Sequence, residues 1–174
     1  MDASAIIDTL TPLVPGASLE VGKSVDFATI YVPADHLPVT ARLLLETPAL
    51  RFNVLTELTA VDFMPREPRF EVVVHLVSLG VSGYGDTPKR LRLKVRVPGG
   101  DPRMPTLSGV WASMNWAERE VYDLFGIHFD GHPDLRRILM PEDYEGHPQR
   151  RDFPIGGEPV IFTYNESKMP RWYD

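Results

Sequence analysis

The first fifty residues of the chain space their apolar side chains with two different periods. Residues 6–14 carry apolar side chains at helical spacing, and Pro15 ends this pattern, so we expect a short amphipathic helix. Residues 21–32 alternate as a half-buried strand does, and residues 36–47 again place apolar side chains on one helical face before Pro48. The pattern therefore predicts the order helix, strand, helix.

Three strand-like segments follow, at residues 53–63, 70–79 and 90–97. In the last of them Leu and Val alternate with Arg and Lys, which predicts one buried face and one basic, solvated face. The connectors are short and contain Pro or Gly, so an antiparallel meander is the simplest arrangement. The second connector, GVSGYGD at residues 80–86, has its glycines in the wrong order for a dinucleotide-binding loop, and we expect a hairpin turn there.

A third helix is predicted over residues 113–125, after the Pro-Gly-Gly break at residues 98–100. Gly126 is a natural stop for this helix, and Asn115 with Glu118 resembles a capping pair near its start. The apolar stripe consists of Trp111, Met114, Ala117, Val121 and Leu124. The polar residues that should lie away from this stripe are Glu118, Arg119, Glu120, Tyr122 and Asp123.

These elements predict an α+β fold, with a mostly antiparallel sheet packed with helices, followed by a C-terminal helix and a long irregular extension. Residues 1–126 would form the α+β domain, which includes the helix at 113–125. Residues 127–174 have no sustained period and contain six prolines, yet they are rich in large apolar side chains and so unlike a solvated linker. We therefore expect residues 127–174 to form an extended C-terminal docking segment.

The stretch GHPDLRRILMPEDYEGHPQRRDFP, residues 131–154, contains a Gly-His-Pro triplet twice, each followed by a pair of arginines. A mixed metal site is conceivable on residue types, because His132 and His147 have carboxylates near them in the sequence: Asp134, Glu142, Asp143 and Asp152. The spacing matches no standard metal site, and an imidazole bonded to the backbone is the favoured interpretation. Arg136, Arg137, Arg150 and Arg151 could clamp an anion, but the interleaved acids better suit an interface of paired charges.

The carboxylates of the third helix offer a second candidate chemistry. Glu118 and Glu120 are two residues apart, so they point in different directions and cannot form a close acid–base pair. Arg119 and Asp123 have the spacing of a helical salt bridge, and we favour such a salt-bridge lattice over catalysis. A free-standing acid–base enzyme that uses Glu120, Asp123 and His132 is a minor alternative.

Composition excludes several classes of function. The chain contains no cysteine, so it can form no disulfide, no thiolate zinc site and no cysteine-ligated iron–sulfur cluster. Its formal net charge of -6 argues against a general nucleic-acid binder. The first ten residues resemble neither a secretory signal nor a transit peptide, and the apolar runs are too short to span a bilayer, so we expect any membrane contact to be indirect.

One contiguous block of the sequence resembles a known family. The run EREVYDLF at residues 118–125, then His132, Arg136, Ile138 and Leu139, is similar to the signature of the 30-kilodalton subunit of the proton-pumping NADH:quinone oxidoreductase, respiratory complex I. The continuation PEDYEGHPQRRDFPI resembles the next block of that family. The resemblance covers roughly residues 108–157, and the element order before it is compatible with the family's α+β domain.

The resemblance implies a structural, non-catalytic subunit of an enzyme complex. Members of this family carry no cofactor of their own, and FMN, iron–sulfur clusters and quinone belong to partner subunits. They lie in the peripheral arm beside the quinone-site subunit and neighbouring iron–sulfur subunits, and their C-terminal extensions wrap over these neighbours. We expect no catalytic, cofactor-binding or metal-binding residue here. The absence of a transit peptide suggests a bacterial form, or one whose presequence is missing, assembled on the cytoplasmic side of the inner membrane.

The resemblance also implies which residues dock the partners, through charge-paired contacts. These residues are Glu118, Arg119, Glu120, Asp123, His132, Arg136, Arg137, Arg150 and Arg151. The signature alone does not separate complex I from the equivalent subunit of a related membrane-bound hydrogenase or another quinone- or ferredoxin-linked complex. We carry that second possibility forward as the alternative function.

Overall fold

The computed structural model describes residues 2–79 and 88–154. Its elements, in chain order, are α1 (Ala3–Leu10), β1 (Glu20–Val21), β2 (Ala28–Tyr31), the 3-10 turn η1 (Ala34–His36), α2 (Leu37–Glu46), β3 (Val54–Asp62), β4 (Phe70–Ser78), β5 (Lys89–Val97), β6 (Arg103–Pro105), α3 (Met114–Phe125) and β7 (His128–Asp130). The predicted α+β class is confirmed. The expected hairpin turn at residues 80–86 lies outside the described residues.

The main sheet has the strand order β1-β2-β5-β4-β3. Its three long strands, β3, β4 and β5, form the predicted antiparallel meander. In β5 the buried positions alternate as expected, with Leu91, Leu93, Val95 and Val97 facing the core. The sheet is mixed, because β2 pairs with β5 in parallel.

The single strand predicted at residues 21–32 is wrong, since the chain forms two short strands, β1 and β2, with a polar turn between them. In that turn Asp26 accepts hydrogen bonds from the Ser24 hydroxyl at 2.7 Å and from its neighbour's N–H, that of Phe27, at 2.9 Å. Short polar side chains that bond the local backbone in this way compete with strand pairing. Val25, in this turn, is fully exposed.

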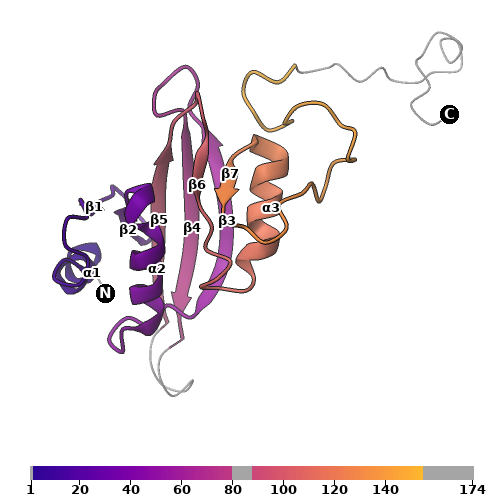
Figure 1. The fold of residues 1–174 in the computed structure, drawn as a ribbon. Helices are drawn as coiled ribbons and strands as arrows, with labels where there is room; N and C mark the ends of the chain where they lie inside the picture. The colour runs from indigo at the N-terminus through magenta and orange to yellow at the C-terminus, as the bar shows by residue number, and fades with distance from the viewer. Residues whose placement is uncertain (1, 80–87, 155–174) are drawn as a thin grey trace, which may run out of the picture.

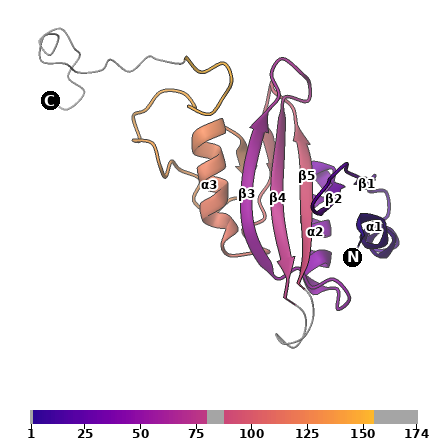
Figure 2. The same ribbon diagram turned by 180° about the vertical axis from the view of Figure 1, so that it is seen from behind.

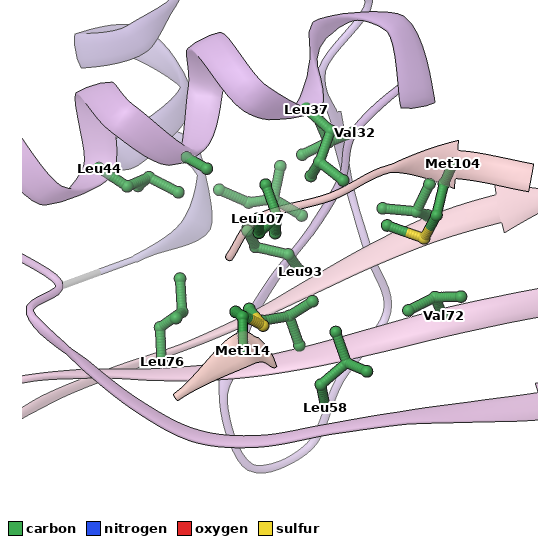
Figure 3. Packing of buried hydrophobic residues seen from close by; sticks show 14 of the residues in the cluster. Val32, Leu37, Leu44, Leu58, Val72, Leu76, Leu93, Met104, Leu107 and Met114 are labelled. Atoms are coloured by element: carbon green, nitrogen blue, oxygen red, sulfur yellow. The ribbon is translucent and has the colours of Figure 1, made fainter. Parts of the chain in front are cut away.

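The helices take different positions around the sheet (Figures 1 and 2). α2 covers one face, α1 lies beyond the β1–β2 end, and α3 lies beside β3 at the opposite end. Figure 3 shows Leu37 and Leu44 of α2 over Leu93 of β5 and Leu76 of β4, with Met114 of α3 in the same layer. One continuous apolar cluster therefore holds α2, the sheet and α3 together.

A second, two-stranded sheet anchors both ends of α3. β6 precedes the helix, β7 follows it, and the two strands pair in parallel, with Met104 opposite Phe129 and both side chains buried. Sequence periodicity did not predict these strands, because three residues are too few to display a period of two. This pair holds α3 against the edge of the main sheet. No helix within residues 2–79 and 88–154 has the length and hydropathy to cross a bilayer.

Candidate docking site on α3 and the strap

The carboxylate of Asp123 is the centre of the contact between α3 and residues 131–154, which we call the strap. Asp123 is fully buried, and its Oδ2 accepts hydrogen bonds from three successive N–H groups, those of Ile138 at 3.0 Å, Leu139 at 2.8 Å and Met140 at 2.8 Å. Its Oδ1 accepts one from Arg137 Nη1 at 2.6 Å. Burial opposes ionisation, but these four donors together hold the pKa of Asp123 below its usual range. A charged, fully satisfied carboxylate thus fixes the strap to the helix.

Arg119 makes a second contact of the same kind. Its Nε donates to the carbonyl oxygen of Arg136 at 3.1 Å, and its Nη2 donates to that of Arg137 at 2.9 Å. The predicted Arg119–Asp123 salt bridge is wrong, because both side chains bind the strap instead. The expectation that they lie away from the buried stripe is also wrong: Arg119 is 7% exposed and Asp123 is 0% exposed. Buried charges need several hydrogen-bonding partners, and a single helical ion pair does not supply them.

The strap also satisfies the last carbonyl groups of α3, which have no partner within the helix and carry its negative dipole end. The Asp123 carbonyl oxygen lies 2.8 Å from His147 Nδ1, and the Leu124 carbonyl accepts the N–H of Gln149 at 3.1 Å. The Phe125 carbonyl accepts Arg150 Nε at 2.6 Å. Burial, above all, lowers the pKa of His147, which favours the neutral imidazole, and the carbonyl oxygen at Nδ1 favours the tautomer that carries its proton there.

Gly126 makes this arrangement possible. It ends α3 as predicted, in the left-handed conformation with φ of 69°. A Cβ atom at this position would clash with the imidazole of His147 and the guanidinium of Arg150. The glycine therefore serves both the helix stop and the close approach of the strap.

Glu118 is fully buried and binds the segment before the helix. Its Oε1 accepts the N–H of Leu107 at 2.6 Å, and its Oε2 accepts the hydroxyl of Thr106. The predicted capping pair with Asn115 is wrong, because α3 begins after Ser113 without a side-chain cap and Glu118 binds Thr106 and Leu107, directly after β6. Burial raises the pKa of Glu118 to about 7, although both hydrogen bonds oppose this rise.

His132 joins the start of the strap to the start of α3. Its Nε2 lies 3.0 Å from the carbonyl oxygen of Asn115, and its Nδ1 accepts the N–H of Asp134 at 3.1 Å. The favoured interpretation, an imidazole bonded to the backbone, is confirmed for both His132 and His147. Nε2 of His132 also lies 3.9 Å from Glu118 Oε2, and both side chains are fully buried.

The far end of the strap is fixed by two residues that sequence reasoning missed, Asp62 and Arg69. Arg69 bridges Asp62, at 2.7 Å, and Asp152, also at 2.7 Å, while Asp62 accepts the N–H of Arg151 at 2.9 Å. Burial opposes ionisation of Asp62, but the bonds from Arg69 and from backbone N–H groups lower its pKa to about 2. No sequence signal marks this contact, since 83 residues separate Arg69 from Asp152.

The nine residues predicted to dock partners fall into two groups. Six of them bind within this chain and attach the strap or the ends of α3: Glu118, Arg119, Asp123, His132, Arg137 and Arg150. The other three, Glu120, Arg136 and Arg151, are exposed. Arg136 makes one local ion pair, with Asp134 at 3.0 Å, on the surface. The six buried or half-buried residues hold the strap and α3 together, and the three exposed residues lie on the surface that α3 and the strap form.

A model of the family described as "Respiratory-chain NADH dehydrogenase, 30 Kd subunit" matches residues 30–159, which include α2, the strands β3, β4 and β5, α3 and the strap. The chain belongs to this family. The resemblance predicted from the signature is therefore confirmed. Members of the 30-kilodalton subunit family are parts of multi-subunit NADH-quinone oxidoreductases, so the partners of this chain are other subunits of such a complex.

Sequence relatives of this family member are named as subunits of NADH-quinone oxidoreductase. The Roseiflexus protein (strain RS-1) is 43% identical over 169 residues, 97% of this chain and 94% of its own. The Herpetosiphon aurantiacus protein is 44% identical over 165 residues, 88% of this chain and 93% of its own. A Thermus thermophilus relative is 52% identical over 126 residues, which cover 70% of this chain and 60% of its own.

Two solved structures resemble this family member over most of its length. A trypsin-resistant fragment (1-134) of Nqo5 aligns with a TM-score of 0.57 and 34% identity, covering 78% of this chain and all of the fragment. A chain of the membrane-bound sulfane sulfur reductase, an archaeal respiratory membrane complex, aligns with a TM-score of 0.69 and 26% identity, covering 98% of this chain and 94% of its own. The fold thus also occurs in a chain of an archaeal respiratory membrane complex.

Proposed function

We propose that this chain is a cofactor-free structural subunit in the peripheral arm of the proton-translocating NADH:quinone oxidoreductase. It positions the quinone-site subunit and the neighbouring iron–sulfur subunits, while FMN, iron–sulfur clusters and quinone are held by those partners. The observation that carries this proposal is the attachment of the strap to α3 through Asp123. Four donors converge on one buried carboxylate and turn an irregular segment into a fixed surface.

The geometry favours this structural role over acid–base catalysis. A catalytic acid or base must reach its substrate and exchange a proton with it. Asp123 is fully buried, and its four donors lower its pKa, so it is a poor proton donor at neutral pH. His132 uses both ring nitrogens for backbone contacts. The minor alternative, an enzyme built on Glu120, Asp123 and His132, is therefore not supported by the arrangement.

The partner-facing surface would include the strap and the exposed residues Glu120, Arg136 and Arg151. Under this proposal the chain of a bacterial cell would lie on the cytoplasmic side of the inner membrane, in contact with the membrane only through the complex. The equivalent subunit of a related respiratory complex is the second candidate, because the sulfane sulfur reductase chain shares 26% identity over nearly the whole length. The relatives named as quinone oxidoreductase subunits are more similar, at 41% to 52% identity, and favour the first candidate.

The test is a double charge reversal, Arg136→Glu with Arg151→Glu, in a tagged chain expressed with its complex. We expect less of the quinone-site subunit and less NADH:quinone activity in the purified complex. The introduced glutamates would repel the acidic groups of the partner subunits that Arg136 and Arg151 are proposed to bind. Arg42→Glu, at an exposed position on α2, is the matched control. Unchanged assembly and activity in the double variant would refute docking through these residues. The co-purifying subunits decide between candidates: an NADH-binding flavoprotein selects the first and a different catalytic subunit the second.

A further inference from the structure

A groove of about 300 Å³ lies where three parts of the chain meet: the first residues of β3, the outward side of α3 and the strap. Leu55 and Glu57 line it from β3, Trp116 and Glu120 from α3, and Ile138 and Leu139 from the strap. The groove exists only while the strap lies on α3, so the Asp123 contact builds one of its walls.

Two exposed apolar side chains share this groove. Trp116 is 61% exposed and Leu139 is 60% exposed, which is unusual for side chains of this size lining the same hollow. Other contacts hold both residues in place. The N–H of Leu139 donates to Asp123. The Trp116 ring lies 5.0 Å from the guanidinium of Arg119, and that guanidinium donates to two carbonyl oxygens of the strap. A fixed, exposed tryptophan beside a leucine loses little conformational entropy on binding and is typical of an interface centre.

The charge of the groove restricts what fits it. Glu57 contributes a carboxylate from β3 and Glu120 one from α3, and no Lys or Arg is among the lining residues. Glu57 is 59% exposed and lies 3.3 Å from His75, whereas Glu120 makes no ion pair within residues 2–79 and 88–154. A partner side chain that enters here must therefore be uncharged or basic.

The backbone at this end of β3 indicates how the partner binds. The ladder between β3 and β4 shifts register between Leu55 and Glu57, which marks a bulge at the edge of the sheet. A bulged edge disfavours the addition of another strand. The partner is therefore expected to insert side chains into the groove rather than extend the sheet.

We infer that this groove receives a segment of another subunit of the complex, one that presents a Lys or Arg flanked by apolar side chains. The apolar side chains pack on Trp116 and Leu139, and the cation lies between Glu57 and Glu120. Arginine suits the site well, because its guanidinium both stacks on aromatic rings and bonds carboxylates. This inference rests on the proposed docking function and deepens it, since it names one surface and the chemistry of its occupant.

Site-specific cross-linking identifies the occupant directly. The chain contains no cysteine, so Leu139→Cys creates one attachment point for a thiol-linked photo-cross-linker before the complex is reconstituted. We expect a cross-link to another subunit, within a peptide that has Lys or Arg beside apolar residues. Leu13→Cys, 47% exposed near α1, is the matched control and should give no such product. A cross-link to residues 155–174 of the same chain, to a second copy, or at the control level would overturn the inference.

Charge reversal at Glu120, one of the two carboxylates that line the groove, is an independent test. Glu120→Arg in the otherwise unchanged chain should weaken binding to the remaining subunits about tenfold, with a smaller effect for Glu120→Gln. Asp8→Arg, exposed on α1, is the control. Binding of Glu120→Arg equal to that of the control would reject a basic occupant. If Arg136 and Arg151 prove necessary for assembly while the groove variants behave as their controls, the groove inference fails and the docking function stands.

Discussion

Arg137 Nη1 lies 2.6 Å from Asp123 Oδ1, and the other oxygen of this carboxylate accepts three backbone N–H groups of the strap. Arg137 also donates to the carbonyl oxygen of Gly146 at 2.9 Å, so it connects the two halves of the strap as well as the strap to the helix. The ion pair is thus one part of a network in which each buried polar atom has a partner. Removal of the Arg137–Asp123 ion pair should loosen the strap more than the main sheet.

Asp123→Asn tests this network. The amide keeps the shape of the carboxylate, but it removes the charge and places an NH2 group against N–H donors. We expect a loss of unfolding free energy of about 3 kcal/mol, as for one broken partner of a buried ion pair. Urea denaturation measures the loss, and limited proteolysis should show faster cleavage after Arg136 and Arg137. Glu120→Gln, exposed on the same helix, should change stability by less than about 0.5 kcal/mol. Equal stability of the two variants would contradict the central role of Asp123.

Glu118 should make the stability of the chain depend on pH in the neutral range. Its pKa rises from 4.5 to about 7 on folding, so the folded state holds this proton more tightly than the unfolded state. The resulting stabilisation is fully present below pH 4.5 and is lost as the pH rises through 7. Over that interval wild type should lose about 3 kcal/mol relative to Glu118→Gln, which cannot ionise. The measurement is chemical denaturation of both proteins across the interval, and a constant difference would contradict burial of an ionisable Glu118.

Gly126→Ala should loosen the strap at the end of α3. The new methyl group meets His147 and Arg150, and φ of 69° is unfavourable for alanine. We expect a loss of about 2 kcal/mol, which corresponds to a decrease in Tm of roughly 4–8 °C for a chain of this size. Gly109→Ala is the matched control, since a Cβ there meets no atom within 4 Å. If both variants melt at the wild-type temperature, the close approach of the strap to Gly126 is wrong.

Arg69→Gln should release the far end of the strap. The substitution leaves the buried carboxylate of Asp62 without its cation and removes the link to Asp152, with an expected loss of about 2–3 kcal/mol. Asp152→Asn breaks only the outer ion pair, in which Asp152 is 42% exposed, and should cost below about 1 kcal/mol. Hydrogen exchange of the Arg151 amide, which binds Asp62, reports the release. Similar exchange rates in the two variants would contradict the idea that the buried Arg69–Asp62 pair holds this end of the strap.

Several elements could be predicted because their signal is local. The meander of β3, β4 and β5 follows from alternating side chains, and α3 with its stop at Gly126 follows from helical spacing. The strands β6 and β7 escaped prediction because they are too short to show a period, and the parallel pairing of β2 with β5 depends on the path of the chain between them. Local patterns define elements, whereas pairing depends on where distant segments meet.

The sequence by itself determined the family, through one contiguous signature, and the element types, through their periodicity. Only the tertiary structure decided the role of the polar residues in that signature. In the sequence, Glu118, Arg119 and Asp123 have the spacing of a solvent-exposed helix face. Their hydrogen-bonding partners, however, come from segments 11 to 18 residues away and bury them. A buried charge is stable only where the fold brings enough hydrogen-bonding groups around it, and that geometry cannot be deduced from spacing along the chain.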